Sequence, residues 1–248
     1  MISGTWSINE FVSDAPVISR EVQMNSLFCL EGKYLIEESS ATSAGNSEWF
    51  LKRILRAVPA EGKSIYDLAN EAVESLPPEE PVPVFLPFLM ASNVNPDAMG
   101  AFVGLSEHQD HRHLVRAVYE GVAFCHRWHY EKLLRSRKEP VTEIRLAGGA
   151  ARSAVWTRIF ADVMGVPVVT VDAAETGALG CAIAAAVASG VKPSVERAVT
   201  DMVRFGAPVW PDPERTARYE RRYALYRRTI EALDPVWADY RAMNTESQ

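Results

Sequence analysis

Hydrophobic residues gather in short runs in the first third of the chain and recur at helical spacing further along. Three runs rich in apolar and β-branched residues predict strands at residues 2–7, 22–30 and 33–38. Glu31 and Gly32 separate the last two runs and are typical of a tight turn. The chain is therefore expected to begin with β-structure.

Two helices are expected to follow these strands. Thr42 or Ser43 can cap the first helix, whose apolar residues recur at helical spacing. These apolar residues are Trp49, Phe50, Ile54 and Leu55. The second helix begins near Ser64, carries Asp67 in its first turn and ends near Leu76.

The rest of the chain alternates between helices and strands. The longest helical pattern spans residues 110–135, after a proline-rich stretch that permits a short strand at 82–85 and a polar loop at 91–96. A strand, a helix, a strand and a helix then follow, at residues 143–147, 153–164, 166–171 and 176–189. This order predicts a sheet with at least two parallel strands and helices on its faces. The tail, residues 213–243, is amphipathic helix broken at Pro235.

The composition is that of a globular α/β protein. With 248 residues, 48% of them hydrophobic and 23% charged, the chain suffices for one large domain, and no repeat or linker divides it. The net charge of -6 argues against nucleic acid or an anionic membrane as the main partner. No apolar stretch approaches the roughly 20 residues that span a bilayer, and the N-terminus lacks signal-peptide features. Cys29, Cys125 and Cys181 lack CxxC spacing and are expected to be reduced, buried thiols of a cytoplasmic protein.

Two glycines follow the strand predicted at 143–147, in the stretch IRLAGGAARSAVWTRIFAD. Gly148 and Gly149 let the backbone come close to a ligand, and the following helix offers N–H groups to an anion. Arg152 and Ser153 add donors at this point. The alternative is an ordinary connection between a strand and a helix, because neither GxGxxG nor a Walker Gly-Lys-Ser/Thr motif is present.

A second glycine turn, Ser3-Gly4-Thr5-Trp6-Ser7, lies near the N-terminus. Its backbone N–H groups and the Thr5 hydroxyl suit a phosphate, although a hairpin with ordinary polar turn residues fits the same letters. Further along, Glu175 precedes a helix of small residues, ETGALGCAIAAAVASG, that favours tight packing against a neighbour. Glu175 is interpreted first as a helix cap and second as a ligand.

The spacing of residues gives little support for a metal site, a serine hydrolase or a nucleic-acid patch. A divalent metal needs convergent ligands, for which the candidates are the five histidines, His108, His111, His113, His126 and His129. The last two are interpreted as lying on a helix surface at the edge of the core, and the GxSxG motif of serine hydrolases is missing. Five arginines of the tail are interpreted as a solvated helix face and not as a nucleic-acid patch. They are Arg218, Arg221, Arg222, Arg227 and Arg228.

Taken in order, these stretches resemble the C-terminal domain of the FGGY family of carbohydrate kinases, from about residue 2 to about residue 240. GAFVGLSEHQDHRHLVRAVYEGVAF resembles the family signature, and LAGGAARSAVWTRIFADVMGVPV resembles its adenosine-binding loop and helix. ETGALGCAIAAAVASG resembles the helix that follows, and SGTWSIN the second phosphate loop. Within the family, GTWSIN, EESSATSAGNSEWF and LPFLMASNVNP look most like kinases of L-xylulose and related ketoses.

The resemblance implies an α/β fold of the RNase H-like (actin-like ATPase) type, with a mixed sheet flanked by helices. It implies transfer of the γ-phosphate of ATP, with Mg²⁺, to a sugar hydroxyl. Carried over by position, Gly4 and Thr5 would contact the β- and γ-phosphates. Gly148 and Gly149 would lie against the α-phosphate and ribose, with Ser153 near the adenine.

Two features depart from the family pattern. Trp6 stands where a small residue is common, and is expected either to pack under the loop or to narrow the phosphate site. In the family, the aspartate base and the sugar site belong to the part before the Gly-Thr loop, and no aspartate here matches that base. The aspartates considered are Asp14, Asp97, Asp162 and Asp172. Residues 1–248 are therefore expected to be the nucleotide-side domain without its N-terminal sugar-binding domain, and inactive alone.

The expected partners are ATP, a sugar, the N-terminal kinase domain and, in a homodimer, a second copy of the chain. The alternative function is a non-catalytic, actin-like binding or interaction module, since this fold also serves scaffolds and sensors. Such a module would expose an apolar cleft face and self-associate.

Overall fold

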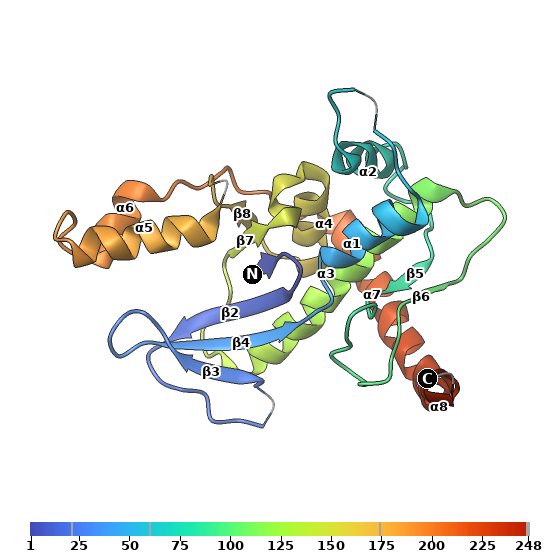
Figure 1. Ribbon diagram of the computed structural model, residues 1–248, viewed down its shortest axis with the longest axis horizontal. Helices are drawn as coiled ribbons and strands as arrows, with labels where there is room; N and C mark the ends of the chain where they lie inside the picture. Colours follow the sequence, from blue (N-terminus) through green and yellow to red (C-terminus); the bar gives the residue numbers. More distant parts are fainter. Residues whose placement is uncertain (21, 60, 174, 247–248) are drawn as a thin grey trace.

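A six-stranded mixed sheet forms one layer of the molecule, and a long helix crosses its face (Figure 1). The computed structural model describes residues 1–20, 22–59, 61–173 and 175–246. The sheet order is β3-β4-β2-β1-β7-β8, in which β3, β4, β2 and β1 pair antiparallel while β1, β7 and β8 pair parallel. The strands are β1 (Ile2–Ser3), β2 (Ser7–Ser13), β3 (Met24–Leu27), β4 (Tyr34–Ser40), β7 (Ile144–Gly148) and β8 (Val168–Thr170). The predicted mixed sheet and its parallel strands are confirmed.

The helices lie on the sheet faces and beyond its ends. They are α1 (Gly45–Trp49), α2 (Ile65–Glu74), α3 (His111–Ser136), α4 (Ala154–Met164), α5 (Thr176–Ala188), α6 (Val195–Met202), α7 (Pro213–Leu233) and α8 (Trp237–Glu246). A π-helical turn (Phe50–Ile54) continues α1, and β5 (Val84–Leu86) pairs with β6 (Ala101–Val103) in a separate hairpin. None of the described helices is both long enough and apolar enough to cross a membrane.

Helix α3 is the centre of the core. Asp110 caps its first turn by accepting a hydrogen bond from the Arg112 N–H, in a capping box with His113. Its buried residues contact β2, β4 and β5 as well as α2, α4 and α7. The helix therefore ties the sheet to the C-terminal half of the chain.

The C-terminal helix α7 contributes more to the core than the sequence indicated. Tyr219, Tyr223 and Tyr226 are buried and their rings pack around Phe124 of α3. Arg222 donates from Nε to Glu120 at 2.7 Å, so the prediction of a solvated basic face is wrong for this arginine. The break at Pro235 is confirmed, because a short 3₁₀ turn separates α7 from α8 there.

Several local predictions fail for identifiable reasons. The run 2–7 is not one strand, because a turn divides it between β1 and the start of β2. Strand β2 then continues to Ser13 through the polar residues Asn9 and Glu10. Neither Thr42 nor Ser43 caps α1, because both hydroxyls are buried and bond to other side chains. Helix α6 was not predicted. Two of the three cysteines expected to be buried are exposed, leaving only Cys125 inside.

Helices α5 and α6 form a paired arm that projects beyond β8, away from the rest of the fold (Figure 1). The small residues of α5 were expected to pack tightly against a neighbour. No residue of α5 is buried, although the helix is composed almost entirely of Ala, Gly, Leu, Ile, Val and Cys. Its main contact is with α6, so most of an apolar helix faces solvent.

The buried carboxylate of Glu120 provides a test of this packing. It accepts hydrogen bonds from Arg116 Nε at 2.9 Å, Arg222 Nε at 2.7 Å and the Tyr219 hydroxyl at 3.3 Å. Replacing it leaves buried guanidinium charge without a counter-ion, so we expect Glu120→Ala to lower the free energy of unfolding by about 3–5 kcal/mol. Urea denaturation measures this loss. The exposed Glu231→Ala on α7 is the control, with a change expected within about 0.5 kcal/mol; equal effects would contradict the expectation.

Candidate functional site

A cavity of about 400 Å³ opens between the β1–β2 turn, α1, α2 and the start of α4. Four of the five residues predicted to bind nucleotide line it, namely Gly4, Thr5, Gly149 and Ser153. The fifth, Gly148, is the last residue of β7 and directly precedes Gly149. Residues separated by more than 140 positions in the sequence thus meet at one opening.

The two glycines after β7 have different structural roles. Gly148 has a φ of 88°, and a Cβ there would lie 2.5 Å from the Ser3 carbonyl oxygen, so the close approach of β7 to β1 requires glycine. A Cβ on Gly149 would meet nothing nearer than 3.8 Å. Gly149 is therefore not needed for the fold, and its missing side chain leaves space in the cavity.

The β1–β2 turn presents its backbone to the same opening. The Gly4 N–H donates to the Trp6 carbonyl at 3.2 Å, and a Cβ on Gly4 would meet no atom within 4 Å. The Thr5 side chain is exposed and lines the cavity. Trp6 is 51% exposed and lines a different cavity, so it neither packs under the loop nor narrows this opening.

Ser153 is already committed to structure. Its Oγ accepts a hydrogen bond from the Trp156 N–H at 3.1 Å, which caps α4, and donates to Asn70 Oδ1 at 2.7 Å. The same Asn70 oxygen accepts from the Tyr119 hydroxyl at 3.1 Å. Ser153 thus fastens α4 to α2 at the cavity wall, and its hydroxyl has little freedom to bind a ligand directly.

An aromatic pair that the sequence reasoning missed forms one wall of the cavity. The rings of Tyr119 and Trp156 stack with centroids 4.0 Å apart and planes within 5°. Tyr119 lies in the segment quoted as the family signature and Trp156 in the glycine-loop helix, but only their contact across α3 and α4 reveals the wall. Both side chains are almost fully buried, so the pair supports the cavity wall and offers a ligand little open surface.

Charges at the mouth of the cavity are mixed. Arg152 pairs with Glu175 at 3.0 Å, and both side chains are largely exposed, so this pair contributes little to stability. Glu175 precedes α5 but makes no side-chain cap, which corrects its interpretation as a cap. Glu48 and Asp67 add negative charge, and Ser64 lowers the pKa of Asp67 by donating backbone and side-chain hydrogen bonds in its capping box.

A buried polar chain supports the turn from below. Ser3 Oγ lies 2.8 Å from Ser43 Oγ, which lies 2.9 Å from His126 Nε2, and His126 Nδ1 lies 3.0 Å from Asn9 Oδ1. His126 and His129 are both fully buried, so their interpretation as surface residues is wrong. The chain links β1, β2 and α3 beneath the turn that carries Gly4.

The buried histidines do not meet the requirements of a metal site. Among the described residues, no group of three or more His, Cys, Asp and Glu side chains is placed to hold a metal ion. His129 instead contacts Ser40 Oγ at 2.7 Å and Glu38 Oε2 at 3.4 Å. Burial opposes the charge on Glu38, but the hydrogen bond with His129 and the nearby Lys132 outweigh it and lower the pKa of this carboxyl.

The fold and the cavity define an α/β domain in which two glycine turns and a buried aromatic pair meet at one cavity. A comparison with known families matches residues 1–189 to the C-terminal domain of the FGGY family of carbohydrate kinases. The chain therefore belongs to the FGGY family. That match spans both glycine turns, α3 and α5.

Individual relatives support the same assignment. The chain is 35% identical over 203 residues to the L-xylulose/3-keto-L-gulonate kinase of Escherichia coli, covering 82% of this chain and 39% of that protein. It is 30% identical over 238 residues to a probable L-xylulose kinase of Haemophilus influenzae, covering 94% of this chain and 46% of that protein. The chain thus spans less than half the length of these relatives.

Solved structures show the fold in whole enzymes. The crystal structure of xylulose kinase from Rhodospirillum rubrum superposes with a TM-score of 0.82 at 26% identity, over 96% of this chain and 47% of that one. Glycerol kinase of Plasmodium falciparum, solved with ADP, shares the fold with a TM-score of 0.76 at 18% identity. The actin-like ATPase fold expected from the sequence is confirmed.

The contrast between the two glycines leads to a stability prediction. Gly148→Ala places a Cβ against the Ser3 carbonyl at a backbone conformation that alanine avoids, so we expect unfolding to become easier by more than about 2 kcal/mol. Gly149→Ala, its matched control, has room for the added methyl and should change stability by less than about 0.5 kcal/mol. Denaturation midpoints of the two variants compare them, and similar losses would contradict the assignment.

The burial of His126 predicts a pH dependence. Burial, with the neighbouring His129, keeps the pKa of His126 well below its ordinary value, so the folded chain holds it neutral while the unfolded chain protonates it near pH 6.5. The stability that goes with a neutral, buried His126 is therefore fully present above pH 6.5. It is lost as the pH falls below 6.5, because the unfolded chain then gains a proton that the folded chain does not bind. His129, whose pKa is raised, contributes in the opposite sense, and its contribution is lost only as the pH rises through its folded pKa.

Between pH 6 and pH 5, His126 should therefore make the free energy of unfolding fall by about 1 kcal/mol per pH unit. We expect His126→Gln to remove that part of the slope, whatever its effect on absolute stability. The exposed His111→Gln is the control and should keep the slope. Chemical denaturation at several pH values measures it, and an unchanged slope in His126→Gln would refute the assignment.

Proposed function

We propose that this chain is the nucleotide-side half of an ATP-dependent sugar kinase. The observation that carries the proposal is the meeting of the two glycine turns, Gly4–Thr5 and Gly148–Gly149, at one cavity walled by stacked aromatic rings. Membership of the FGGY family supports the same function. The parent reaction moves the γ-phosphate of ATP to a sugar hydroxyl.

The residues present fit an adenine nucleotide. Gly4 and Gly149 have no side chain to fill the cavity, so backbone N–H groups can approach phosphate oxygens closely. The exposed Thr5 hydroxyl is free to donate to a phosphate, and Arg152 can offer a cation at the mouth. Tyr119 and Trp156 back the cavity as a buried apolar pair, and Ser153 holds this wall by capping α4.

Mg²⁺ is a different case. The described residues bring no three metal-ligating side chains together, so they provide no complete set of protein ligands for a metal ion. Mg²⁺ in kinases is commonly held by substrate phosphates together with one or two carboxylates. The ion would therefore enter with ATP, and its chemistry is to neutralise charge on the phosphates.

We propose that a second domain supplies the sugar-binding site and the catalytic base. None of Asp14, Asp97, Asp162 and Asp172 lines the cavity, and Asp162 is buried against Arg215. Names of relatives that include L-xylulose kinases favour a ketose as the acceptor. We infer that this chain, acting alone, transfers no phosphate.

The α5–α6 arm supports the proposed second domain. An apolar helix without a buried residue costs stability in water unless another surface covers it. The relatives that this chain matches are about twice as long, so their other half is the occupant that we propose for this face. A homodimer through the same face is the competing outcome and would favour the non-catalytic interaction module.

Calorimetric titration with ATP and Mg²⁺ tests the site. We expect Gly149→Glu to weaken binding more than tenfold, because a carboxylate would enter the space proposed for phosphate without disturbing the backbone. Thr5→Val, which removes one hydroxyl, should weaken binding by roughly tenfold. Arg152→Gln should weaken it less than Gly149→Glu does, since the arginine is exposed.

Arg197→Gln is the matched control for Arg152→Gln. Arg197 is also an exposed arginine paired with a carboxylate, but it lies on α6, away from the cavity. The Arg197→Gln variant should bind ATP as the unmodified chain does. Equal affinities of the unmodified chain and Gly149→Glu would refute the nucleotide site. Formation of sugar phosphate from L-xylulose in the same samples would refute the inference that the chain is inactive alone.

A further inference from the structure

The cavity that Trp6 lines, of about 400 Å³, is a neighbour of the candidate nucleotide site. We call it the Trp6 cavity. Thr5 lines the nucleotide cavity, and the next residue of the turn, Trp6, lines this one. After β4, residues 40–41 line the Trp6 cavity, whereas residues 44–45 line the nucleotide cavity. The same two segments of chain therefore contribute to the walls of both cavities.

The inner wall of the Trp6 cavity is charged. Glu38 and His129 line it with side chains that are 2% and 1% exposed, and Glu38 Oε2 lies 3.4 Å from His129 Nδ1. The Lys132 ammonium lies 3.3 Å from the same carboxylate oxygen, and its side chain is 31% exposed. Buried ion pairs of this kind add little net stability, because burial costs each charge its hydration. Charged groups buried at a cavity are therefore candidates for binding a ligand.

Cations outnumber anions among the described residues that line the Trp6 cavity. Arg20 lines it as an exposed residue, and Lys132 as a partly exposed one. Burial opposes the charge on His129, but hydrogen bonds with Cys125 and Glu38 outweigh it and raise the pKa of this histidine. Two permanent cations and a histidine that favours its charged form thus accompany the single carboxylate of Glu38. This balance favours a ligand with an anionic group.

The uncharged lining residues suit hydroxyl groups. Ser39 and Ser92 supply hydroxyls, and Gln23 and Asn93 supply amides. These side chains both donate and accept hydrogen bonds, as the hydroxyls of a sugar do. Trp6 is 51% exposed at this cavity, so its flat ring can cover the apolar C–H face of a sugar. The lining therefore matches a polar, hydroxyl-rich compound better than an apolar one.

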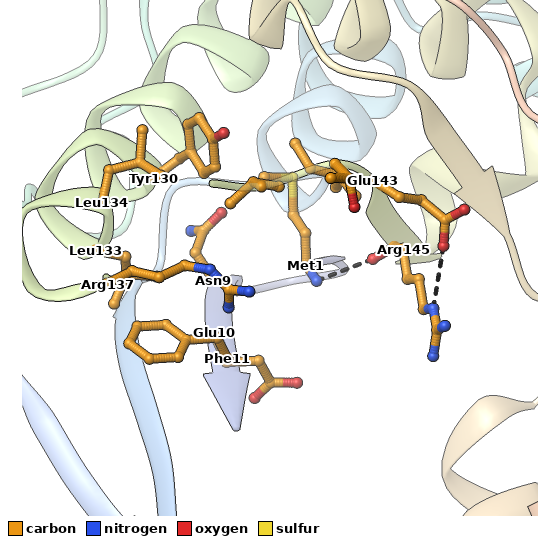
Figure 2. A pocket seen from close by; sticks show the side chains of 13 residues that line it. Met1, Asn9, Glu10, Phe11, Tyr130, Leu133, Leu134, Arg137, Glu143 and Arg145 are labelled. Carbon is orange, nitrogen blue, oxygen red and sulfur yellow. Dashed lines mark hydrogen bonds and ion pairs between the residues drawn. The ribbon is translucent and has the colours of Figure 1, made fainter. Parts of the chain in front are cut away.

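The larger cavity beside Met1, of about 460 Å³, has a different character (Figure 2). None of the charged side chains among its 13 lining residues is buried. Its two arginines bond within the protein, since Arg145 pairs with Glu143 at 3.2 Å and Arg137 donates to the Glu139 carbonyl at 2.9 Å. A buried, charged wall thus distinguishes the Trp6 cavity from this one.

We propose that the Trp6 cavity binds a small anionic sugar, that is, a short chain of hydroxyl-bearing carbons with one phosphate or carboxylate group. Lys132 and Arg20 hold the anionic group, the serines and amides hold the hydroxyls, and Trp6 covers the carbon chain. The site is separate from the nucleotide cavity and from the acceptor site that we assign to a second domain. Its binding of a sugar therefore does not depend on the proposed kinase reaction.

Calorimetric titration of the unmodified chain with four compounds tests the ligand class. D-ribulose 5-phosphate and D-gluconate carry the two anionic groups on a hydroxylated chain, D-ribulose lacks the charge, and inorganic phosphate lacks the carbon chain. We expect one of the two anionic sugars to bind at least about tenfold more tightly than D-ribulose and inorganic phosphate. The tighter of the two identifies the anionic group that the site prefers.

Two variants locate the binding. Lys132→Gln removes a cation and should weaken binding of the preferred compound at least about tenfold. Lys192→Gln is its matched control, because Lys192 is 27% exposed and pairs with Asp201, but lines neither cavity. Trp6→Ala should weaken binding roughly threefold to tenfold. Trp210→Ala, at a tryptophan that is 70% exposed and lines neither cavity, should leave it unchanged.

Melting temperatures show whether each variant is folded. If Lys132→Gln is unstable, Trp6→Ala still decides the question, because its side chain is half exposed and contributes little to folding. Crossed titrations separate this site from the nucleotide site. Lys132→Gln should bind ATP as the unmodified chain does, and Gly149→Glu should bind the anionic sugar as the unmodified chain does. An absence of ATP binding would count against the proposed function only.

Four results overturn the proposal. Inorganic phosphate that binds as tightly as the sugar phosphate would show a site for anions only. D-ribulose that binds as tightly as both anionic sugars would show that the cations have no role. An anionic sugar that is lost in Gly149→Glu but kept in Lys132→Gln would be bound in the nucleotide cavity. Finally, no heat of binding from either anionic sugar at millimolar concentration would show that the Trp6 cavity binds neither.

Discussion

The close approach of β7 to β1 at Gly148 is the contact on which the candidate site depends. Only a residue without a side chain permits the Ser3 carbonyl oxygen to lie 2.5 Å from where a Cβ of residue 148 would be. That approach places the β1–β2 turn beside the start of α4, although the two segments are more than 140 residues apart. Beneath it, the hydrogen-bonded chain from Ser3 through Ser43 to His126 fixes the turn to α3. The geometry of the opening thus follows from one glycine and one buried polar chain.

Long periodic elements and ordered motifs could be predicted from the sequence. Helices α2, α3 and α4 begin close to the expected starts, directly after Ser64, Asp110 and Ser153, because these side chains accept hydrogen bonds locally. The mixed sheet and the family followed from the order of the motifs. In each case the information lies within a few adjacent residues or in their order along the chain.

What could not be predicted depends on contacts between distant segments. Strand β2 contains the polar residue Asn9, which is buried and is hydrogen-bonded to His126 of the distant helix α3. Likewise, the tyrosines of α7 are buried because Phe124 of α3 lies between them, and Arg222 is drawn inward by Glu120. The aromatic wall of the cavity has the same origin, since Tyr119 and Trp156 belong to different helices. The hydrogen bond from Ser153 of the α4 cap to Asn70 of α2 likewise depends on a contact between distant segments.

The exposed α5 changes how variation in this chain should be interpreted. Its side chains contribute little to the core of the isolated domain, because none of them is buried and their main contact is with α6. A larger or polar residue at an exposed position of that helix would therefore change the stability of the isolated chain little. If a second domain covers the helix, the same change would act on assembly alone. Folding thus constrains the core of the domain, whereas association constrains α5. Tolerance to substitution in the isolated domain therefore does not show which residues of α5 association requires.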